Sequence, residues 1–278
     1  MSTLADSALI DDQARAERAA NERRRKAALQ NFGIRLISFA VFLGIWQLAA
    51  MNVDPVLFTT PGKVAVAAVE MIRNGELWAG LAPSLLVLLM GLTLAIIFGT
   101  LLGLALARFR VLDVGLTVYI TFLYSIPSVA LVPLIVLWAG YETTAKVIIL
   151  FLFAFFPMVI NTYQGVKAVD PKLLEVGRAF RCSEAQLWKN IVLPGALPFI
   201  VTGMRLALGR GLIGMVLADL YTAISGIGYL IVRTASTFQV DKMFVPIVTL
   251  GLLGVTLTAL LRVAERHVAP WTTAGAED

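Results

Sequence analysis

The chain has 278 residues, 59% of them hydrophobic, and a mean hydropathy of +0.84. Water-soluble domains carry about 45–50% apolar residues, so this composition indicates a membrane protein. The net charge of +5 is more typical of Lys and Arg kept on the cytoplasmic side of a bilayer than of a nucleic-acid-binding surface. One cysteine, Cys182, and one histidine, His267, exclude a disulfide framework within the chain and a His/Cys metal cluster.

The first 33 residues are polar and mix acidic with basic side chains, up to the run Arg23-Arg24-Arg25-Lys26. They lack the short apolar core and the small-residue cleavage site of a signal peptide. We predict that residues 1–33 form a cytoplasmic tail that is frayed or partly helical.

Six apolar segments are candidate membrane spans, because a spanning helix needs about 20 mostly apolar residues. They are residues 36–51, 80–107, 114–141, 147–166, 195–220 and 243–261. Pro127 and Pro157 predict kinks in continuous helices rather than breaks. Gly99 and Gly103 predict ordinary close packing of the second span. Residues 64–72 predict a short helix at the outer surface.

The distribution of basic residues predicts the orientation of these spans. With the N-terminus inside, sixteen Lys and Arg lie in inner segments, five in outer segments and two in the fifth span. We therefore predict an all-α membrane protein with about six transmembrane helices over residues 34–263. Both termini, including a tail of residues 264–278, are then cytoplasmic.

The longest inner loop, about residues 166–194, has ordered local chemistry. Asp170 before Pro171 predicts an N-capped helix, and Ser183 with Gln186 predicts a capping box that begins a second one. Pro194 is expected to stop or bend this second helix. The apolar face of the first helix packs either on the chain itself or in a groove of a cytoplasmic partner, and the pattern alone favours the chain itself.

The loop also resembles the EAA loop of ABC-importer permeases, in which Glu-Ala-Ala is followed by Gly and then by Ile-x-Leu-Pro. Glu175 and the segment Ile191-Val192-Leu193-Pro194 match the pattern, whereas Arg181 stands where the family has Gly. The resemblance implies a coupling helix that docks on an ATPase subunit. The residues implied in coupling are Glu175, Gly177, Arg178, Ala179, Phe180, Arg181, Ile191, Leu193 and Pro194.

From about residue 34 to 271 the chain is similar to permeases of the nitrate, sulfonate and taurine family. The likeness includes Ile126-Pro127-Ser128, Phe155-Phe156-Pro157 and Gly203-Met204-Arg205. The family implies a type I importer in the bacterial inner membrane, with two permease chains, two cytoplasmic ATPase subunits and a periplasmic or lipid-anchored solute-binding protein. Because this chain has no P-loop, Mg-ATP would be held by the partner ATPase, and we expect no catalytic residue, cofactor or metal site here.

Charged and polar side chains in the spans are candidates for the solute pathway. Arg205 and Arg210 either attract an anionic solute or snorkel to the inner surface, and the second reading is favoured. Asp219 is expected to be a cap or a gate contact. The pathway candidates are Tyr124, Ser125, Ser128, Thr202 and Arg205.

Two other classes of protein are weighed against an ATP-driven permease. A secondary transporter or channel would show acidic residues in mid-span or an inverted repeat, and neither is evident. A membrane-embedded enzyme would need paired carboxylates, a Ser-His pair or a metal site. The sequence does not name the solute, which the resemblance implies is a small anion such as nitrate, taurine or another sulfonate. Two-fold symmetry favours a homodimer.

Overall fold

The computed structural model describes residues 2–268, and every regular element in that range is a helix. Most of the predicted C-terminal tail, from residue 269 on, lies outside the described residues. The chain divides into two compact units, residues 1–63 and 64–278.

The first unit is built on α1 (Ser2–Met51), a single helix of 50 residues. The polar segment predicted as a tail continues this helix without a break, and its abundance of Ala, Arg and Glu, all good helix formers, accounts for that. The apolar half of α1 contains a candidate span, Leu29–Met51. After α1 the chain turns, and the Trp46 indole donates a hydrogen bond to the Thr59 carbonyl at 2.9 Å.

The second unit begins with α2 (Pro61–Arg73), which confirms the short helix predicted at residues 64–72. Its long helices are α3 (Glu76–Arg108), α6 (Thr143–Lys167), α9 (Leu193–Thr222) and α11 (Val240–Val268). Its shorter helices are α4 (Arg110–Ser125), α5 (Ser128–Ala139), α7 (Pro171–Ala179), α8 (Glu184–Leu187) and α10 (Ile227–Ser236).

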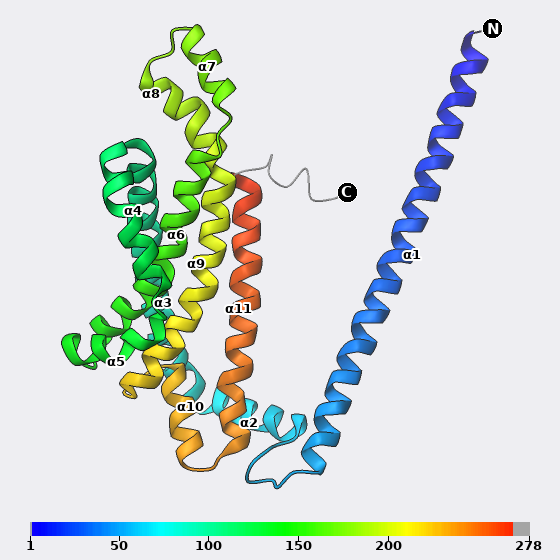
Figure 1. Cartoon of the computed structure of the whole chain (residues 1–278). Helices are drawn as coiled ribbons and strands as arrows, with labels where there is room; N and C mark the ends of the chain where they lie inside the picture. Colours follow the sequence, from blue (N-terminus) through cyan, green and yellow to red (C-terminus); the bar gives the residue numbers. More distant parts are fainter. Residues whose placement is uncertain (1, 269–278) are drawn as a thin grey trace. The chain divides into compact units, whose positions relative to one another are not determined.

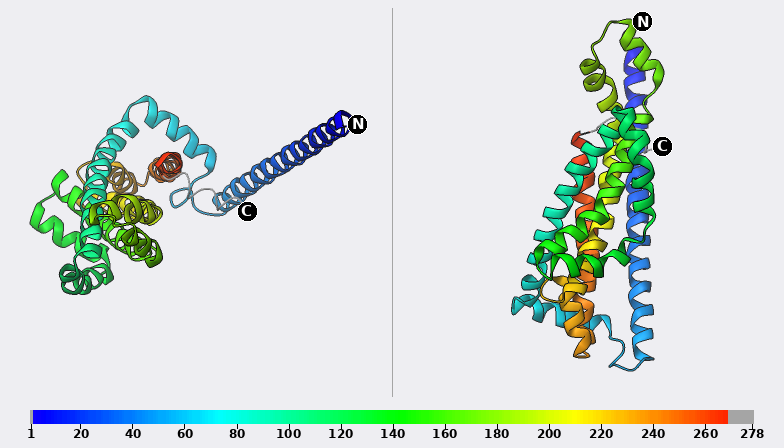
Figure 2. Two further views of the ribbon diagram at one scale, coloured as in Figure 1. Left: turned by 90° about the horizontal axis from the view of Figure 1, so that it is seen from above. Right: turned by 60° about the vertical axis from the view of Figure 1, so that its left-hand side comes forward.

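Helix α6 lies at the centre of the second unit, between α3 and α9 (Figures 1 and 2). Helices α7 and α8 lie at one end of the bundle, called here the loop end, and α2 and α10 lie at the opposite end (Figure 1). The core is apolar, with Leu88, Leu150 and Met215 fully buried where the three helices meet.

Glycines allow α3 and α6 to approach closely. A Cβ at Gly99 would lie 2.7 Å from the Met158 Cβ, and one at Gly103 would lie 2.7 Å from the Val159 carbonyl oxygen. This confirms the ordinary packing role predicted for the two glycines.

The third predicted span is bent rather than continuous. Helices α4 and α5 meet at 94°, with Ile126 extended (φ −69°, ψ 128°) and Pro127 directly after it. A residue that precedes proline is driven out of the helical region, because the proline ring clashes with its backbone and Cβ. The prediction that Pro127 only kinks a continuous helix was therefore wrong.

At Pro194 the helix does not stop, although a stop or a bend was predicted there. A π-helical turn, Trp188–Val192, joins α8 to α9, and the Leu193 amide donates to the Trp188 carbonyl. A π turn shifts the backbone hydrogen bonds by one residue and so accommodates a proline that has no N–H. Within the described range, five helical segments are long and apolar enough to span a membrane, or six if the bent pair counts as one span.

Candidate functional site

The corner of the inner loop is formed by Arg181, in the position where the resembling family has glycine. Its φ is +55°, the left-handed conformation that glycine adopts freely. The Cys182 amide donates to the Gly177 carbonyl at 3.0 Å, and the Arg181 amide donates to the Arg178 carbonyl at 2.8 Å. These two bonds form a Schellman motif that ends α7. Arg181 thus makes the turn that glycine would make, at the cost of backbone strain.

Both predicted helix starts in the loop are present. The Asp170 carboxylate accepts from the Lys172 amide at 2.9 Å. Ser183 and Gln186 form the complete capping box, with bonds of 2.7 and 3.3 Å. Since the caps satisfy amides that the helices themselves leave unpaired, the two short helices have defined ends although each is short.

One face of α7 packs against the rest of the loop. Gly177 is buried, and a Cβ there would collide with the Leu187 side chain and lie 3.0 Å from the Ile191 Cδ1. Gly177 and Ile191, two of the predicted coupling residues, therefore pack inside the loop.

The side of α7 that adjoins this contact has no cover within the described chain. Leu173 and Val176 are each 53% exposed and Phe180 is 80% exposed. These three residues, which we call the α7 stripe, recur at helical spacing and lie on one side of the helix. Four other predicted coupling residues are also exposed: Glu175, Arg178, Ala179 and Arg181. Leu193 and Pro194 lie further along the chain, at the start of α9.

The loop is tied to the ends of α3 and α6. The Arg108 guanidinium lies 3.4 Å from the Glu184 carboxylate and 5.8 Å from the centre of the Trp188 ring. A recess of about 300 Å³ separates the loop from the helix ends, and three cationic residues, Arg108, Lys167 and Arg178, line it. The loop thus contacts the end of α3 through Glu184 and Trp188.

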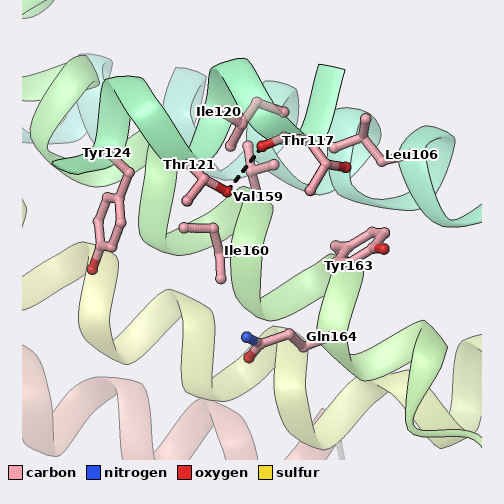
Figure 3. Close-up of a pocket in the computed structure, with 9 residues that line it drawn as sticks. All are labelled: Leu106, Thr117, Ile120, Thr121, Tyr124, Val159, Ile160, Tyr163 and Gln164. Atoms are coloured by element: carbon pink, nitrogen blue, oxygen red, sulfur yellow. Dashed lines mark hydrogen bonds between the residues drawn. The ribbon is translucent and has the colours of Figure 1, made fainter. Parts of the chain in front are cut away.

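A mostly apolar cavity of about 340 Å³ lies between α4 and α6, with Leu106 of α3 at one end and Tyr124 at the other (Figure 3). Its lining residues are Leu106, Thr117, Ile120, Thr121, Tyr124, Val159, Ile160, Tyr163 and Gln164. Tyr124 is the predicted pathway residue that this cavity contains.

The other pathway candidates do not line the cavity. Ser125 and Thr202 each donate to a backbone carbonyl of their own helix, at 2.8 and 2.9 Å. Ser128 begins α5. Arg205 pairs with Glu265 of α11 at 2.7 Å, and the Glu265 side chain is only 7% exposed. Whether any of these residues contacts solute stays a prediction.

A buried ion pair lies at the end of the bundle opposite the loop. The Lys146 ammonium is 2.8 Å from the Asp219 carboxylate, and their side chains are 3% and 0% exposed. Asp219 also accepts from Ser84 and, at 3.4 Å, from the Gly228 amide, while the Ile227 amide donates to Ser84 at 2.8 Å. Ser84 and Asp219 thus cap the start of α10 from two other helices.

The capping role predicted for Asp219 is confirmed. Three features were not predicted from the sequence: the pairing of Lys146 with Asp219, the pairing of Glu265 with Arg205, and helix α10. A usable signal was present for α10, since Ile227, Leu230 and Thr234 follow helical spacing and are buried. No sequence signal joins Lys146 to Asp219, which are 73 residues apart.

Comparison with known proteins identifies the family. Residues 91–273 match the model of binding-protein-dependent transport system inner membrane components. The chain is 32% identical over 245 residues to a probable ABC transporter permease of Brucella melitensis, covering 88% of this chain and 99% of that protein. It is 31% identical over 252 residues to a putative aliphatic sulfonates transport permease of Bacillus subtilis (89% and 91% covered). The taurine transport system permease of Escherichia coli is 29% identical over 241 residues (84% and 88% covered).

Solved structures support the same fold. An amino acid ABC transporter matches with a TM-score of 0.56 at 18% identity, covering 72% of this chain and 98% of that one. The MetNI methionine ABC transporter in an inward-facing form matches with a TM-score of 0.54 at 18% identity, covering 69% and 93%. The chain therefore belongs to the family of binding-protein-dependent transport system inner membrane components, as a multi-pass membrane permease of an ABC importer.

Proposed function

We propose that this permease carries a small anionic solute, such as a sulfonate, taurine or nitrate, which a periplasmic or lipid-anchored binding protein delivers. Two of the similar permeases are named for aliphatic sulfonates and for taurine. We further propose that two copies of the chain pair about a two-fold axis, because one chain can then supply both halves of the pathway.

The α7 stripe is the proposed docking surface for a cytoplasmic ATPase subunit that holds Mg-ATP. The observation that carries this proposal is the exposure of Leu173, Val176 and Phe180 on a helix that is packed on Leu187 through Gly177 and whose ends are capped. An ordered amphipathic helix with an uncovered apolar face suits a groove on a partner protein.

The connections of the loop suggest how docking moves the spans. Helix α8 runs through the π turn into α9 without a break, and Arg108 joins the loop to α3. Closure of two ATPase subunits would then displace α7 and shift the attached spans as rigid bodies, which alternates access to the pathway.

Co-purification of the tagged permease with its ATPase tests this proposal. We expect Phe180→Ser and Glu175→Lys to lose the ATPase while the permease stays monodisperse in detergent. Phe238→Ser is the matched control and should retain the ATPase. Phe238 is 70% exposed in the turn between α10 and α11, and α10 lies at the end of the bundle opposite the loop (Figure 1).

Equal recovery of the ATPase with Phe180→Ser and with the wild-type chain would refute docking through the α7 stripe. If no ATPase associates and the purified chain moves solute along an ion gradient, the alternative of a secondary transporter or channel replaces the importer mechanism.

A further inference from the structure

Arg210 places a positive charge in the middle of a membrane span. It follows the first residue of α9 by 17 positions and precedes the last by 12, which corresponds to about 25 and 18 Å of helix. A Cβ at its neighbour Gly211 would lie 3.6 Å from Leu150 and 3.8 Å from Ala154, residues near the midpoint of α6. Both helices therefore put Arg210 near mid-depth.

The side chain lies on a face of α9 that the chain's own helices leave open. Arg210 is exposed, as are Leu206 (48%) and Ile213 (56%) on the same side. A Cβ at Gly209 would meet nothing within 4 Å. A guanidinium at mid-depth is costly against lipid tails, so this face is expected to border water or another protein.

No carboxylate of the described chain balances this charge. Asp219 is bound to Lys146, Glu265 to Arg205, and Asp113 to Lys167 at 2.9 Å. The other acidic residues of the described helices lie near or beyond the ends of the spans. A second copy of the chain would therefore bring no free carboxylate to Arg210 at this depth.

Tyr124 links Arg210 to the cavity between α4 and α6. The Arg210 guanidinium lies 5.0 Å from the centre of the Tyr124 ring, and the same ring closes one end of the cavity (Figure 3). Gln164 places a side-chain amide at the cavity, whereas the Thr121 hydroxyl donates to the Thr117 carbonyl at 2.9 Å and the Tyr163 hydroxyl donates to Asp113 at 2.7 Å. A volume of about 340 Å³, lined mainly by apolar groups with few polar ones, is within the range of small-molecule sites. The aromatic contact holds the guanidinium beside this cavity.

We propose that Arg210, positioned by Tyr124, is the anion-binding residue of the solute pathway, and that it takes the sulfonate or carboxylate group of the passing solute. A guanidinium offers a planar pair of donors that matches the oxygens of these anions. The rest of the solute occupies the mostly apolar cavity. This inference rests on the proposed function and adds the residue that selects the solute's charge; Arg233 of α10, which pairs with Glu76 at 3.3 Å, is its control.

The first test measures binding to the purified full chain by thermal denaturation in detergent at constant ionic strength. The probes are ethanesulfonate, taurine and benzoate, with ethyl methyl sulfone as an uncharged analogue of ethanesulfonate. We expect at least one anion, but not the sulfone, to raise the Tm of the wild type and of Arg233→Gln. Arg210→Gln should need at least about tenfold more anion for the same rise.

Arg210→Lys keeps the charge without the planar fork, so it should give an intermediate response, and it serves as the second variant if Arg210→Gln does not fold. Equal responses of the wild type and Arg210→Gln, or no response of the wild type to any of the three anions, would overturn the proposal.

The second test measures ATP-driven uptake of the same anions by the importer reconstituted with its ATPase and binding protein. Uptake unchanged in Arg210→Gln would overturn the anion site while leaving the importer function intact. Conversely, anion binding through Arg210 in a chain that recruits no ATPase would leave the anion site standing and refute the proposed function.

Discussion

Arg181 shows how one side chain can be kept at a position that glycine would occupy with less strain. Its φ of +55° is required by the Schellman motif, whose two hydrogen bonds turn the chain from α7 toward α8. The left-handed conformation costs a residue with a Cβ about 1–2 kcal/mol. The side chain itself is exposed at the corner of the loop, beside the α7 stripe.

We predict that Arg181→Gly raises the free energy of unfolding by about 1 kcal/mol, because it removes this strain. Arg181→Ala, which also loses the side chain but keeps the strain, should give no comparable gain. Chemical denaturation in detergent measures both variants. An equal gain from the two would show that the side chain, and not the backbone, is the source of strain.

In the buried pair of Lys146 and Asp219, the cost of removing two charges from water is offset by their mutual attraction and by hydrogen bonds. Both charges are taken out of solvent, and hydrogen bonds from Ser84 and Gly228 complete the shell of Asp219. Removal of one partner leaves the other charge buried and unbalanced. In addition, Asp219 and Ser84 hold the first amides of α10.

We expect Lys146→Met to destabilise the fold by about 3–5 kcal/mol, since it leaves Asp219 charged and unpaired. The double variant Lys146→Met with Asp219→Asn should recover a large part of that loss, because both charges are then gone. Unfolding in detergent across the double-mutant cycle gives the coupling free energy. Additive effects of the two substitutions would contradict the assigned pair.

At the scale of elements, glycines decide how closely α3 and α6 pack. At Gly103 the obstacles to a side chain are the Val159 carbonyl and the Cβ of Thr162, both at 2.7 Å, and neither is the movable end of a flexible side chain. Such sites differ from Gly115 on α4, where a Cβ would meet nothing within 4 Å. The same residue type is thus a packing requirement on one helix and dispensable on another.

Gly103→Ala is predicted to destabilise the permease by about 1–3 kcal/mol, through overpacking of the contact between α3 and α6. Gly115→Ala, the matched control, should be neutral or stabilising by up to about 1 kcal/mol, because alanine is the better helix former. Thermal denaturation of the two purified variants compares them directly. A loss at Gly115 as large as at Gly103 would refute the packing explanation.

Across the whole second unit, ionised side chains gather toward the two ends of the bundle. Arg108, Lys167 and Glu184 lie at the loop end, and Lys146 and Asp219 lie at the opposite end, with Arg210 between them. This separation fits helices that cross a bilayer, where charges in the hydrocarbon region are costly. The predicted orientation, with the loop end in the cytoplasm, remains to be tested.

Cys182, the single cysteine of the chain, lies in the loop and is partly exposed, which makes it a natural reporter of orientation. We predict that a membrane-impermeant maleimide labels it only after cells are permeabilised. In a Cys182→Ser background, Phe238→Cys at the opposite end should be labelled in intact cells. The reverse pattern would invert the topology and place the α7 stripe outside the cytoplasm.

Much of this architecture could be predicted before the structure was known, because the features concerned are local. Apolar runs of spanning length located the membrane helices, and Asp170 and Ser183 marked the starts of α7 and α8 through caps that need only neighbouring residues. The order of short motifs around Glu175 indicated the family that the comparisons confirmed. The consequences of Pro127 and Pro194 were predicted less well, since proline permits a bend, a break or a π turn according to its surroundings.

Hydropathy, charge bias and capping patterns thus establish a multi-pass helical permease with an ordered loop, because bilayer thickness and helix geometry constrain every residue of a span in the same way. Contacts between distant segments follow from packing alone. The partners of Lys146, Arg205 and Arg210 belong to other helices, and which face of α7 is buried depends on Gly177 meeting Leu187. The sequence shows that a charged residue lies within an apolar span, but which residue neutralises that charge depends on which helix the fold places beside it.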